Sequence, residues 1–235
     1  MAVHAVVEGS LVDTRHGPAR LLRSPAERAA TTLVLGHGAG GGAQARELGW
    51  LAQDLPPAGI EVVRVEQPWR VAGRKVAARA AVLDDSWLDV LAQLVLATPL
   101  VVGGRSSGAR VACRTAVSAG AHGCLVLAFP LHPPWRPEQS RLPELQASGV
   151  PTLVVQGDRD PFGAPADFTE LPDTCRVAAL IDADHEFAVR RSSYRTSVLT
   201  RADLISAVIG WVREIIPAAR TPAKASSRLT PGRST

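Results

Sequence analysis

Short runs of apolar residues recur along the chain, and the segments between them repeat apolar positions with a helical period. Apolar runs of this length, bounded by turn-forming residues, are typical of buried strands. They fall at residues 32–35, 60–65, 100–103, 124–129, 152–156 and 177–181. Segments of helical length and pattern fall at residues 43–55, 76–97, 108–119 and 201–216. Because strands alternate with helices, the pattern predicts an α/β fold with a mostly parallel sheet and helices on both faces.

The two ends of the chain add detail to this picture. Residues 3–22 predict one or two antiparallel edge strands joined by a turn at residues 16–18. The last helix is predicted to start with Thr200 and Asp203, which have the spacing of a capping box. Its apolar stripe would then be formed by Leu204, Val208, Trp211 and Ile215.

The composition is that of a chain with one sizeable core. Of the 235 residues, 46% are hydrophobic and 20% are charged, and α/β chains of this length commonly form one domain. The formal net charge is +4, and the segment from Pro217 onwards carries four basic side chains and no acidic one. We therefore predict a single domain over residues 1–216 and a basic, disordered tail over residues 217–235. The remaining body is formally neutral, which gives no reason to expect a nucleic-acid partner.

The cysteines and the first residues of the chain indicate the cellular compartment in which the protein is expected. Cys113, Cys124 and Cys175 fall at no metal-ligand spacing and leave an odd thiol if two of them pair, which favours a reducing environment. The chain has no apolar run long enough to cross a membrane, and its first residues carry charges where a signal peptide is apolar. We expect a cytoplasmic protein with no membrane partner, no metal and no cofactor.

One motif carries a specific chemical signal. In GGRSSGAR, the residues Gly104, Ser106 and Gly108 form G-x-S-x-G directly between a predicted strand and a predicted helix. A sharp turn at this point forces its central residue into a strained backbone, and the flanking glycines remove side chains that would clash. Ser106 is therefore the candidate nucleophile, and Ser107 is a competitor that lies off the centre of the glycine frame.

A serine hydroxyl is a poor nucleophile unless a base accepts its proton and an acid orients that base. His185 follows the apolar run at residues 177–181 and is the candidate base. Asp158 and Asp160 follow the run at residues 152–156, and either could be the acid. The chain order serine, aspartate, histidine is the order expected for a nucleophile on a turn of this kind.

The acid is chosen among three aspartates. Asp160 is favoured over Asp158, because it lies further into the loop and because Pro161 biases its backbone towards an extended conformation. Asp158 is interpreted as a turn former. Asp184 is a weaker candidate, since sequence neighbours such as Asp184 and His185 rarely face each other.

The glycine-rich segment LVLGHGAGGGAQ, residues 33–44, has two interpretations. Gly36, Gly38 and Gly41 satisfy the spacing of a dinucleotide-binding loop, and Glu66 after the next apolar run could then hold a ribose. A Walker-type phosphate loop is excluded, because no Lys followed by Ser or Thr closes the glycines.

The alternative is that this loop supplies a backbone N–H to an oxyanion. Attack on a carbonyl creates a negative oxygen that must be met by preorganised donors, here the N–H groups of Ala39 and Ser107. The dinucleotide interpretation leaves Ser106, Asp160 and His185 unexplained and puts a bulky histidine inside the turn. The oxyanion interpretation is therefore favoured.

With these residues assembled, the chain resembles an α/β-hydrolase, in particular the compact dienelactone-hydrolase-like branch. It is similar to the small α/β-hydrolase-like domain found in bacterial proteins and in a regulatory subunit of a nuclear histone-acetylation complex. The resemblance rests on the segments LVLGHGAGG, GGRSSGAR, FPLHPPWRPE, VPTLVVQGDRDPFG and DADHEF. It implies Ser106 as nucleophile, Asp160 as acid and His185 as base. Dienelactone hydrolases carry cysteine in place of Ser106, so their substrate is not carried over.

The expected site is shallow. The segment between Phe129 and Thr152, where many relatives insert a helical lid, has room for a loop and one short helix. This favours small esters over long acyl chains. The candidate substrate-binding residues are His37, Arg105, His132, Trp135 and Phe162. Beside the nucleophile, Arg105 could attract an acidic substrate or could equally point to solvent or pair structurally.

The leading hypothesis is a serine hydrolase that cleaves a small carboxylic ester through an acyl-enzyme. A non-catalytic interaction module, whose basic tail recruits a partner, is the alternative from a different class. A nucleotide-binding oxidoreductase is the third. All three chemical positions are filled, which favours the enzyme.

Overall fold

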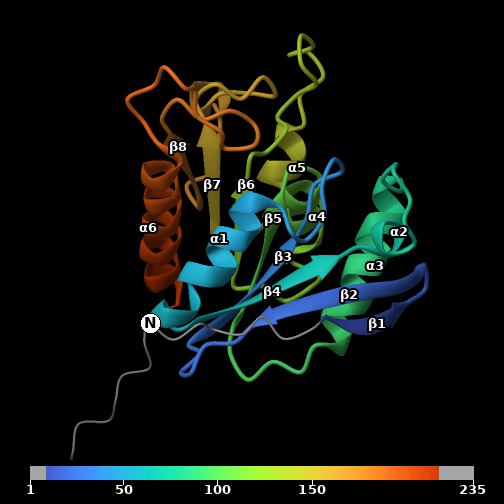
Figure 1. Ribbon diagram of the computed structural model, residues 1–235. Coiled ribbons are helices and arrows are strands. Elements are labelled where there is room, and N and C mark those ends of the chain that lie inside the picture. Colours follow the sequence, from blue (N-terminus) through green and yellow to red (C-terminus); the bar gives the residue numbers. More distant parts are fainter. Residues whose placement is uncertain (1–8, 217–235) are drawn as a thin grey trace, which may run out of the picture.

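A computed structural model describes residues 9–216, which form one eight-stranded sheet with helices on both faces (Figure 1). The strands are β1 (Ser10–Thr14), β2 (Gly17–Ser24), β3 (Thr31–Gly36), β4 (Ile60–Glu66), β5 (Leu100–Arg105), β6 (Gly123–Leu127), β7 (Thr152–Gly157) and β8 (Cys175–Leu180). The α-helices are α1 (Arg46–Asp54), α2 (Pro68–Val71), α3 (Ala80–Gln93), α4 (Ser107–Thr115), α5 (Leu142–Gln146) and α6 (Ser197–Ile215). Two 3-10 turns are η1 (Pro56–Ala58) and η2 (Pro165–Asp167). The predicted basic tail and residues 1–8 lie outside the described residues.

The strand order is β1-β2-β4-β3-β5-β6-β7-β8. The six strands from β4 to β8 in this order are mutually parallel, and β2 runs antiparallel to both β1 and β4. The predicted α/β fold and the antiparallel hairpin at the edge are therefore confirmed. The hairpin turn lies at Arg15 and His16, slightly earlier than predicted, and Gly17 already begins β2 with a φ of +105°.

Alternate residues of each buried strand serve different cores, because successive side chains of a strand point to opposite faces. On β3, Val34 joins the core beneath α3 and α4, whereas Leu33 and Leu35 join the core beneath α1 and α6. All three are fully buried. Apolar runs with both faces covered are the reason that these strands show no polar alternation in the sequence.

The last helix begins earlier than the sequence predicted. α6 starts at Ser197, and its N-cap is Thr196, whose Oγ1 accepts a hydrogen bond from the N–H of Leu199 at 3.3 Å. Thr200 is buried inside the helix, and Asp203 forms an ion pair with Arg195. The prediction of a capping box at Thr200 and Asp203 is therefore wrong, because an equally suitable threonine stands four residues earlier.

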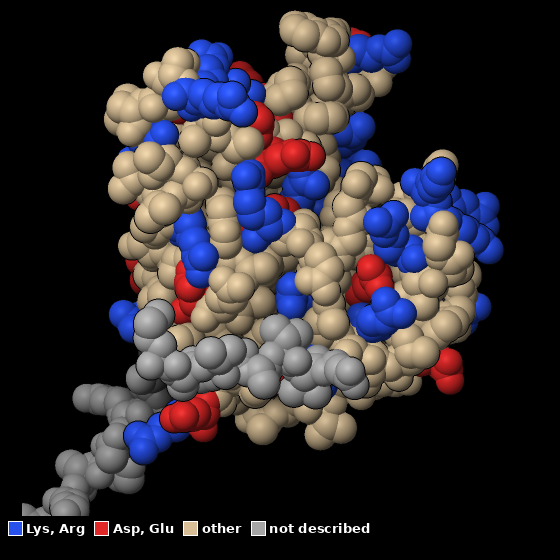
Figure 2. Space-filling view, viewed as in Figure 1, with Lys and Arg blue, Asp and Glu red and all other residues tan. Residues whose placement is uncertain are grey.

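The described surface carries both signs of charge. Figure 2 shows Lys and Arg interspersed with Asp and Glu over most of the viewed face, with basic side chains gathered over the α2 end. No helix within residues 9–216 is long and apolar enough to span a membrane.

Candidate active site

The turn between β5 and α4 places Ser106 at the carboxyl edge of the sheet. Its φ is 52° and its ψ is −111°, a strained conformation for a residue with a Cβ atom. Its N–H donates to the carbonyl oxygen of Leu127 at 2.9 Å, which fixes the turn to the neighbouring strand β6. The serine hydroxyl is thereby held beside the N-terminus of α4, where free N–H groups favour negative charge.

The glycines around Ser106 are required by close backbone packing. A Cβ atom on Gly104 would lie 2.7 Å from the carbonyl oxygen of Gly36, and one on Gly108 would lie 2.5 Å from the same oxygen. Both distances are far shorter than a van der Waals contact, and backbone atoms of a buried strand cannot easily move away. The ends of β3 and β5 and the start of α4 therefore meet without side chains between them.

The structure brings the three distant candidates into one chain of hydrogen bonds. The Oγ of Ser106 lies 3.0 Å from Nε2 of His185, and Nδ1 of the same ring lies 2.7 Å from Oδ2 of Asp160. The carboxylate of Asp160 can only accept, so Nδ1 carries a proton and Nε2 is left to accept from the serine hydroxyl. This arrangement can move a proton from the hydroxyl to the imidazole.

Backbone contacts hold together the loop after β7, which carries Asp160, and the loop after β8, which carries His185. A Cβ atom on Gly157, the last residue of β7, would lie 2.3 Å from the carbonyl oxygen of Ala183. The N–H of Arg159 donates to that same oxygen at 3.0 Å, and the N–H of Asp158 donates to the carbonyl of Leu180 at 3.2 Å. The loop after β7 thus lies directly on the loop after β8, which places Asp160 beside His185.

The carboxylate of Asp160 is buried and fully partnered. Its side chain has 0% exposure. Besides His185, it accepts hydrogen bonds from the side-chain amide of Gln156 at 2.9 Å and from the N–H of Phe162 at 2.8 Å. A buried carboxylate needs such donors to remain charged, so this set holds an ionised Asp160 in one orientation.

The other two aspartates lie outside the hydrogen-bonded chain. Asp158 is exposed. Oδ1 of Asp184 accepts from the N–H groups of Glu186 and Ala188, both at 2.9 Å, and so stabilises the turn that carries His185. The geometry therefore favours Asp160, as the sequence did.

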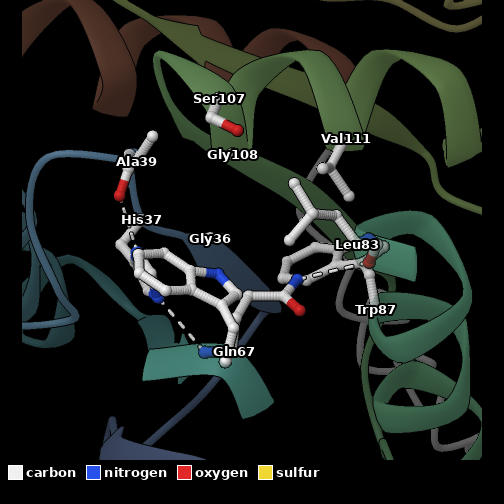
Figure 3. A pocket seen from close by; sticks show the side chains of 11 residues that line it. Gly36, His37, Ala39, Gln67, Leu83, Trp87, Ser107, Gly108 and Val111 are labelled. Carbon is white, nitrogen blue, oxygen red and sulfur yellow. Dashed lines mark hydrogen bonds between the residues drawn. The ribbon is translucent and has the colours of Figure 1, made fainter. Parts of the chain in front are cut away.

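A small inner cavity lies at the point where the glycine loop meets α4 (Figure 3). Ala39 and Ser107 both line it, along one side of the view, and Gln67 lies on the opposite side. Neither backbone N–H of Ala39 and Ser107 donates to an acceptor within residues 9–216. The two amides that the sequence singled out therefore have no backbone acceptor among the described residues, and their use as oxyanion donors stays a prediction.

His37 braces this glycine loop. Its Nδ1–H donates to the carbonyl oxygen of Gly38 at 2.8 Å, and its Nε2 accepts from the N–H of Gln67 at 3.1 Å (Figure 3). Burial lowers the pKa of the His37 imidazole, which fits a neutral ring with one donor and one acceptor. Both ring nitrogens are used inside the protein, so His37 positions the loop and has no nitrogen free for a substrate.

Arg105 is also committed to internal partners. Its Nη2 donates to the carbonyl oxygen of His185 at 3.1 Å, and its Nε lies 3.2 Å from Oε1 of Glu47. Both side chains are buried, with exposures of 9% and 4%. Burial raises the pKa of the Glu47 carboxyl, and the charge of Arg105 opposes this shift. Of the two interpretations of Arg105, these contacts favour structural pairing over attraction of an acidic substrate, because the guanidinium ties α1 to the loop that carries His185.

A second cavity, which we call the base-side cavity, borders this ion pair and has a volume of about 320 Å³. Among its lining residues are Gly40, Arg105 and Glu186, which are the chain neighbours of Ala39, Ser106 and His185. Arg46 and Glu186 lie at its exposed side. Ser106, His185 and Asp160 are themselves not among its lining residues.

The remaining candidate substrate-binding residues have different environments. The ring of Phe162 packs against the ring of His185, with centroids 4.4 Å apart. The N–H of His132 donates to the carbonyl of Phe162 at 3.1 Å, so His132 supports that loop. Trp135 is 92% exposed. A contact between substrate and His132, Trp135 or Phe162 stays a prediction.

The elements of the dinucleotide interpretation are used otherwise in the structure. Glu66, the candidate ribose ligand, pairs with Arg20 at 2.8 Å. Within residues 9–216 there is no cluster of three or more His, Cys, Asp or Glu side chains that could hold a metal ion.

Sequence reasoning missed three buried polar residues around the site, namely Gln156, Glu47 and Gln67. Gln156 is fully buried, and besides Asp160 its amide group bonds to Gly163 O at 2.7 Å and accepts from the N–H of Phe129 at 2.8 Å. The signal that could have found it is the single polar residue in the apolar run TLVVQG. The burial of Glu47 has no comparable signal, because α1 exposes other polar residues at similar spacing.

Comparisons with known proteins place this geometry in context. A family model described as an alpha/beta hydrolase domain matches residues 29–213. A lidless α/β serine hydrolase from Xanthomonas campestris superposes with a TM-score of 0.68 at 21% identity, covering 93% of this chain and 100% of that one. An α/β serine hydrolase homologue from Coxiella burnetii gives 0.68 at 17% identity, with coverages of 87% and 99%. A dienelactone hydrolase from Anabaena variabilis gives 0.67 at 14% identity, with coverages of 88% and 96%. A search of curated protein sequences found no match.

Proposed function

Because this chain belongs to the α/β-hydrolase family, we propose that it is a serine hydrolase that cleaves a small carboxylic ester through an acyl-enzyme. The observation that carries the proposal is the unbroken hydrogen-bonded chain from Ser106 through His185 to Asp160. Neither the dinucleotide nor the interaction-module hypothesis accounts for such a chain beside two amides that have no backbone acceptor among the described residues.

In the first half of the proposed reaction, the Oγ of Ser106 attacks the ester carbonyl carbon while Nε2 of His185 accepts its proton. The carbonyl oxygen becomes an oxyanion, which accepts hydrogen bonds from the N–H groups of Ala39 and Ser107. The protonated imidazole then donates its proton to the leaving alkoxy oxygen, the carbon–oxygen bond breaks and an alcohol departs. The acyl group remains bound to Ser106.

In the second half, Nε2 of His185 accepts a proton from water, whose oxygen attacks the acyl carbon. Collapse of the second tetrahedral intermediate returns the proton to the Oγ of Ser106 and releases the carboxylic acid. Asp160 stays ionised throughout, holding the Nδ1–H of His185 and stabilising the imidazolium.

The preference for small esters is supported by the absence of a large insertion above the site. Between β6 and β7, α5 is a short helix and the remaining residues form a loop, so little covers the substrate. Since Cys113, Cys124 and Cys175 are free thiols, we also propose that the reaction takes place in a reducing compartment such as the cytoplasm.

The proposal is tested by labelling the purified protein with a fluorophosphonate probe. The wild-type protein should be labelled and should hydrolyse p-nitrophenyl acetate. Ser106→Ala should lose labelling and lose at least about a thousandfold in kcat, because nucleophilic attack is removed. Ser107→Ala should still be labelled, since its backbone N–H is retained. Undiminished labelling of Ser106→Ala would contradict the assignment.

A further inference from the structure

A cavity of about 350 Å³, which we call the outer cavity, lies beside α2 and the start of α3. Its volume falls in the range of cavities that hold small organic molecules. Apart from His16 in the turn of the β1–β2 hairpin, all its lining residues lie between Gln67 and Ser86. Ser106, His185 and Asp160 are not among them, so the outer cavity does not contain the hydrogen-bonded chain of the candidate active site.

The buried lining of the outer cavity combines apolar side chains with two polar atoms that lack a hydrogen-bond partner. Trp69 and Leu83 are buried, with 5% and 7% exposure, and Val82 lies beside them. Among the described residues, neither Nε1 of Trp69 nor Oε1 of Gln67 has a partner. The side-chain nitrogen of Gln67 donates to the carbonyl oxygen of Leu83 at 3.3 Å, which fixes the amide and leaves its oxygen free (Figure 3). Because unpaired buried polar atoms are costly, these two indicate a ligand with both an acceptor and a donor.

The inner cavity is too small for such a ligand, although Gln67 and Trp69 line it as well. Its volume is about 10 Å³, roughly the room of one water molecule. In Figure 3 the amide oxygen of Gln67 points away from Ala39 and Ser107, which line the opposite side of the inner cavity. A ligand larger than water that contacts Gln67 therefore lies in the outer cavity.

The rim of the outer cavity is basic. Residues 70–79, which we call the basic segment, contain no acidic residue and four exposed basic ones, namely Arg70, Arg74, Lys75 and Arg79. Within residues 9–216, none of these four side chains forms an ion pair with a carboxylate. Arg74 lines the cavity, and its N–H donates to the carbonyl oxygen of Trp69 at 3.0 Å. The basic side chains gathered over the α2 end in Figure 2 thus lie at the mouth of a cavity.

The carboxylates of this region already have basic partners. Oδ2 of Asp85 lies 3.2 Å from Nε2 of His16, and Oδ1 of Asp85 lies 3.6 Å from Nη1 of Arg15. Two further carboxylates pair away from the cavity, Asp84 with Arg114 and Glu66 with Arg20. The guanidinium of Arg74 therefore has no counter-charge among the described residues, and an anionic ligand would supply one.

We propose that the outer cavity is a binding site for a small organic anion that has an apolar ring, one carboxylate group and one hydrogen-bond donor. The carboxylate accepts hydrogen bonds from the guanidinium of Arg74 and from Nε1 of Trp69. The ring packs against Leu83 and Val82, and the donor reaches Oε1 of Gln67. This site is separate from Ser106, so the inference goes beyond the proposed function and does not depend on it.

Isothermal titration calorimetry with indole-3-acetate tests the site, because this molecule has a carboxylate, an apolar ring and an N–H. The wild-type protein should bind it at one site per chain with a Kd below about 1 mM. Indole-3-acetamide is neutral and should bind at least about tenfold more weakly, because the charge-assisted hydrogen bonds are lost. 1-Naphthylacetate has no N–H and should bind about fivefold more weakly, because Oε1 of Gln67 stays unpaired.

Three variants locate the ligand. Arg74→Ala should weaken the binding of indole-3-acetate at least about tenfold. Arg79→Ala is the matched control, because Arg79 is exposed in the same basic segment but does not line the cavity, and it should change Kd by less than about threefold. Val82→Phe adds bulk inside the cavity at unchanged charge and should weaken binding at least about tenfold.

Several results would overturn the anion site. They are the absence of indole-3-acetate binding, equally tight binding of either analogue, unchanged binding in Val82→Phe, and equal losses in Arg74→Ala and Arg79→Ala. Loss of binding after fluorophosphonate has labelled Ser106 would also overturn it, because the ligand would then occupy the candidate active site. A protein that resists the fluorophosphonate but binds indole-3-acetate through Arg74 would contradict the serine hydrolase and leave the anion site intact.

Discussion

Among single residues, Arg105 illustrates how the site depends on groups that do not touch the substrate. Its guanidinium lies between Glu47 on α1 and the carbonyl of His185, at 3.2 and 3.1 Å, and both charged side chains are buried. Breaking a buried pair on one side leaves an uncompensated charge, whereas replacing both partners by apolar residues is often neutral. The contribution of Arg105 to the stability of the fold can therefore be measured separately from its contribution to the position of His185.

Arg105→Met should cost about 3–5 kcal/mol of unfolding free energy, because Glu47 is left buried without its counter-charge. The double variant with Glu47→Met should recover most of that stability. Its kcat should stay roughly tenfold below wild type with KM little changed, since the bond to the His185 carbonyl is still missing. Urea unfolding and steady-state kinetics measure the two effects, and recovery of both together would show that Arg105 only stabilises the fold.

At the scale of elements, the junction of β3, β5 and α4 depends on the absence of side chains. A Cβ atom on Gly108 would lie 2.5 Å from the carbonyl oxygen of Gly36 and 2.8 Å from that of His37. Gly108→Ala should therefore lower stability by about 1–3 kcal/mol or more and displace α4 with Ser106. The expected result is a lower Tm together with slower labelling by fluorophosphonate.

Gly210→Ala is the control for this element-scale prediction. Gly210 lies within α6, and a Cβ atom added there meets nothing within 4 Å. Because glycine weakens a helix interior, this substitution should raise stability by about 0.5–1 kcal/mol and leave labelling unchanged. If Gly108→Ala behaved in the same way, close packing would not be the reason for the motif.

At the scale of the whole molecule, the reactivity of the thiols measures whether the core beneath α3 and α4 opens to solvent. Cys113, Cys124 and Cys175 come from α4, β6 and β8 and all pack in this core. Burial raises the pKa of the Cys175 thiol to about 12. At pH 8 a thiol with this pKa is ionised to only about one part in ten thousand, and the thiolate is the species that reacts with disulfide reagents.

Ellman's reagent at pH 8 should therefore leave the native protein almost unmodified over minutes, while denaturant should release the full complement of three thiols. The sign follows from the raised pKa: reaction of native Cys175 should become about tenfold faster with each pH unit above 8, because the thiolate fraction rises in that proportion below the pKa. Rapid reaction of one thiol in the native protein at pH 8 would show that this core opens locally.

Much of the fold was predictable because the relevant physics is local. The buried strands are continuous apolar runs, so their positions can be predicted from the amino-acid sequence. The observed β3, for example, exceeds its predicted range by only one residue at each end. The G-x-S-x-G motif and the chain order of Ser106, Asp160 and His185 were visible for the same reason. The start of α6 was misplaced because Thr196 and Thr200 are equivalent as N-caps in the sequence, and only packing buries one of them.

The sequence by itself determined the alternation of strands and helices, the glycines that a close turn requires and the residues able to handle a proton. The tertiary structure alone decided that Gln156 faces Asp160 and that Glu47 pairs with Arg105. The physical reason is that helical and strand periods act over a few neighbouring residues. Contacts between loops depend on the order of the strands in the sheet, which brings together residues that are far apart in the chain.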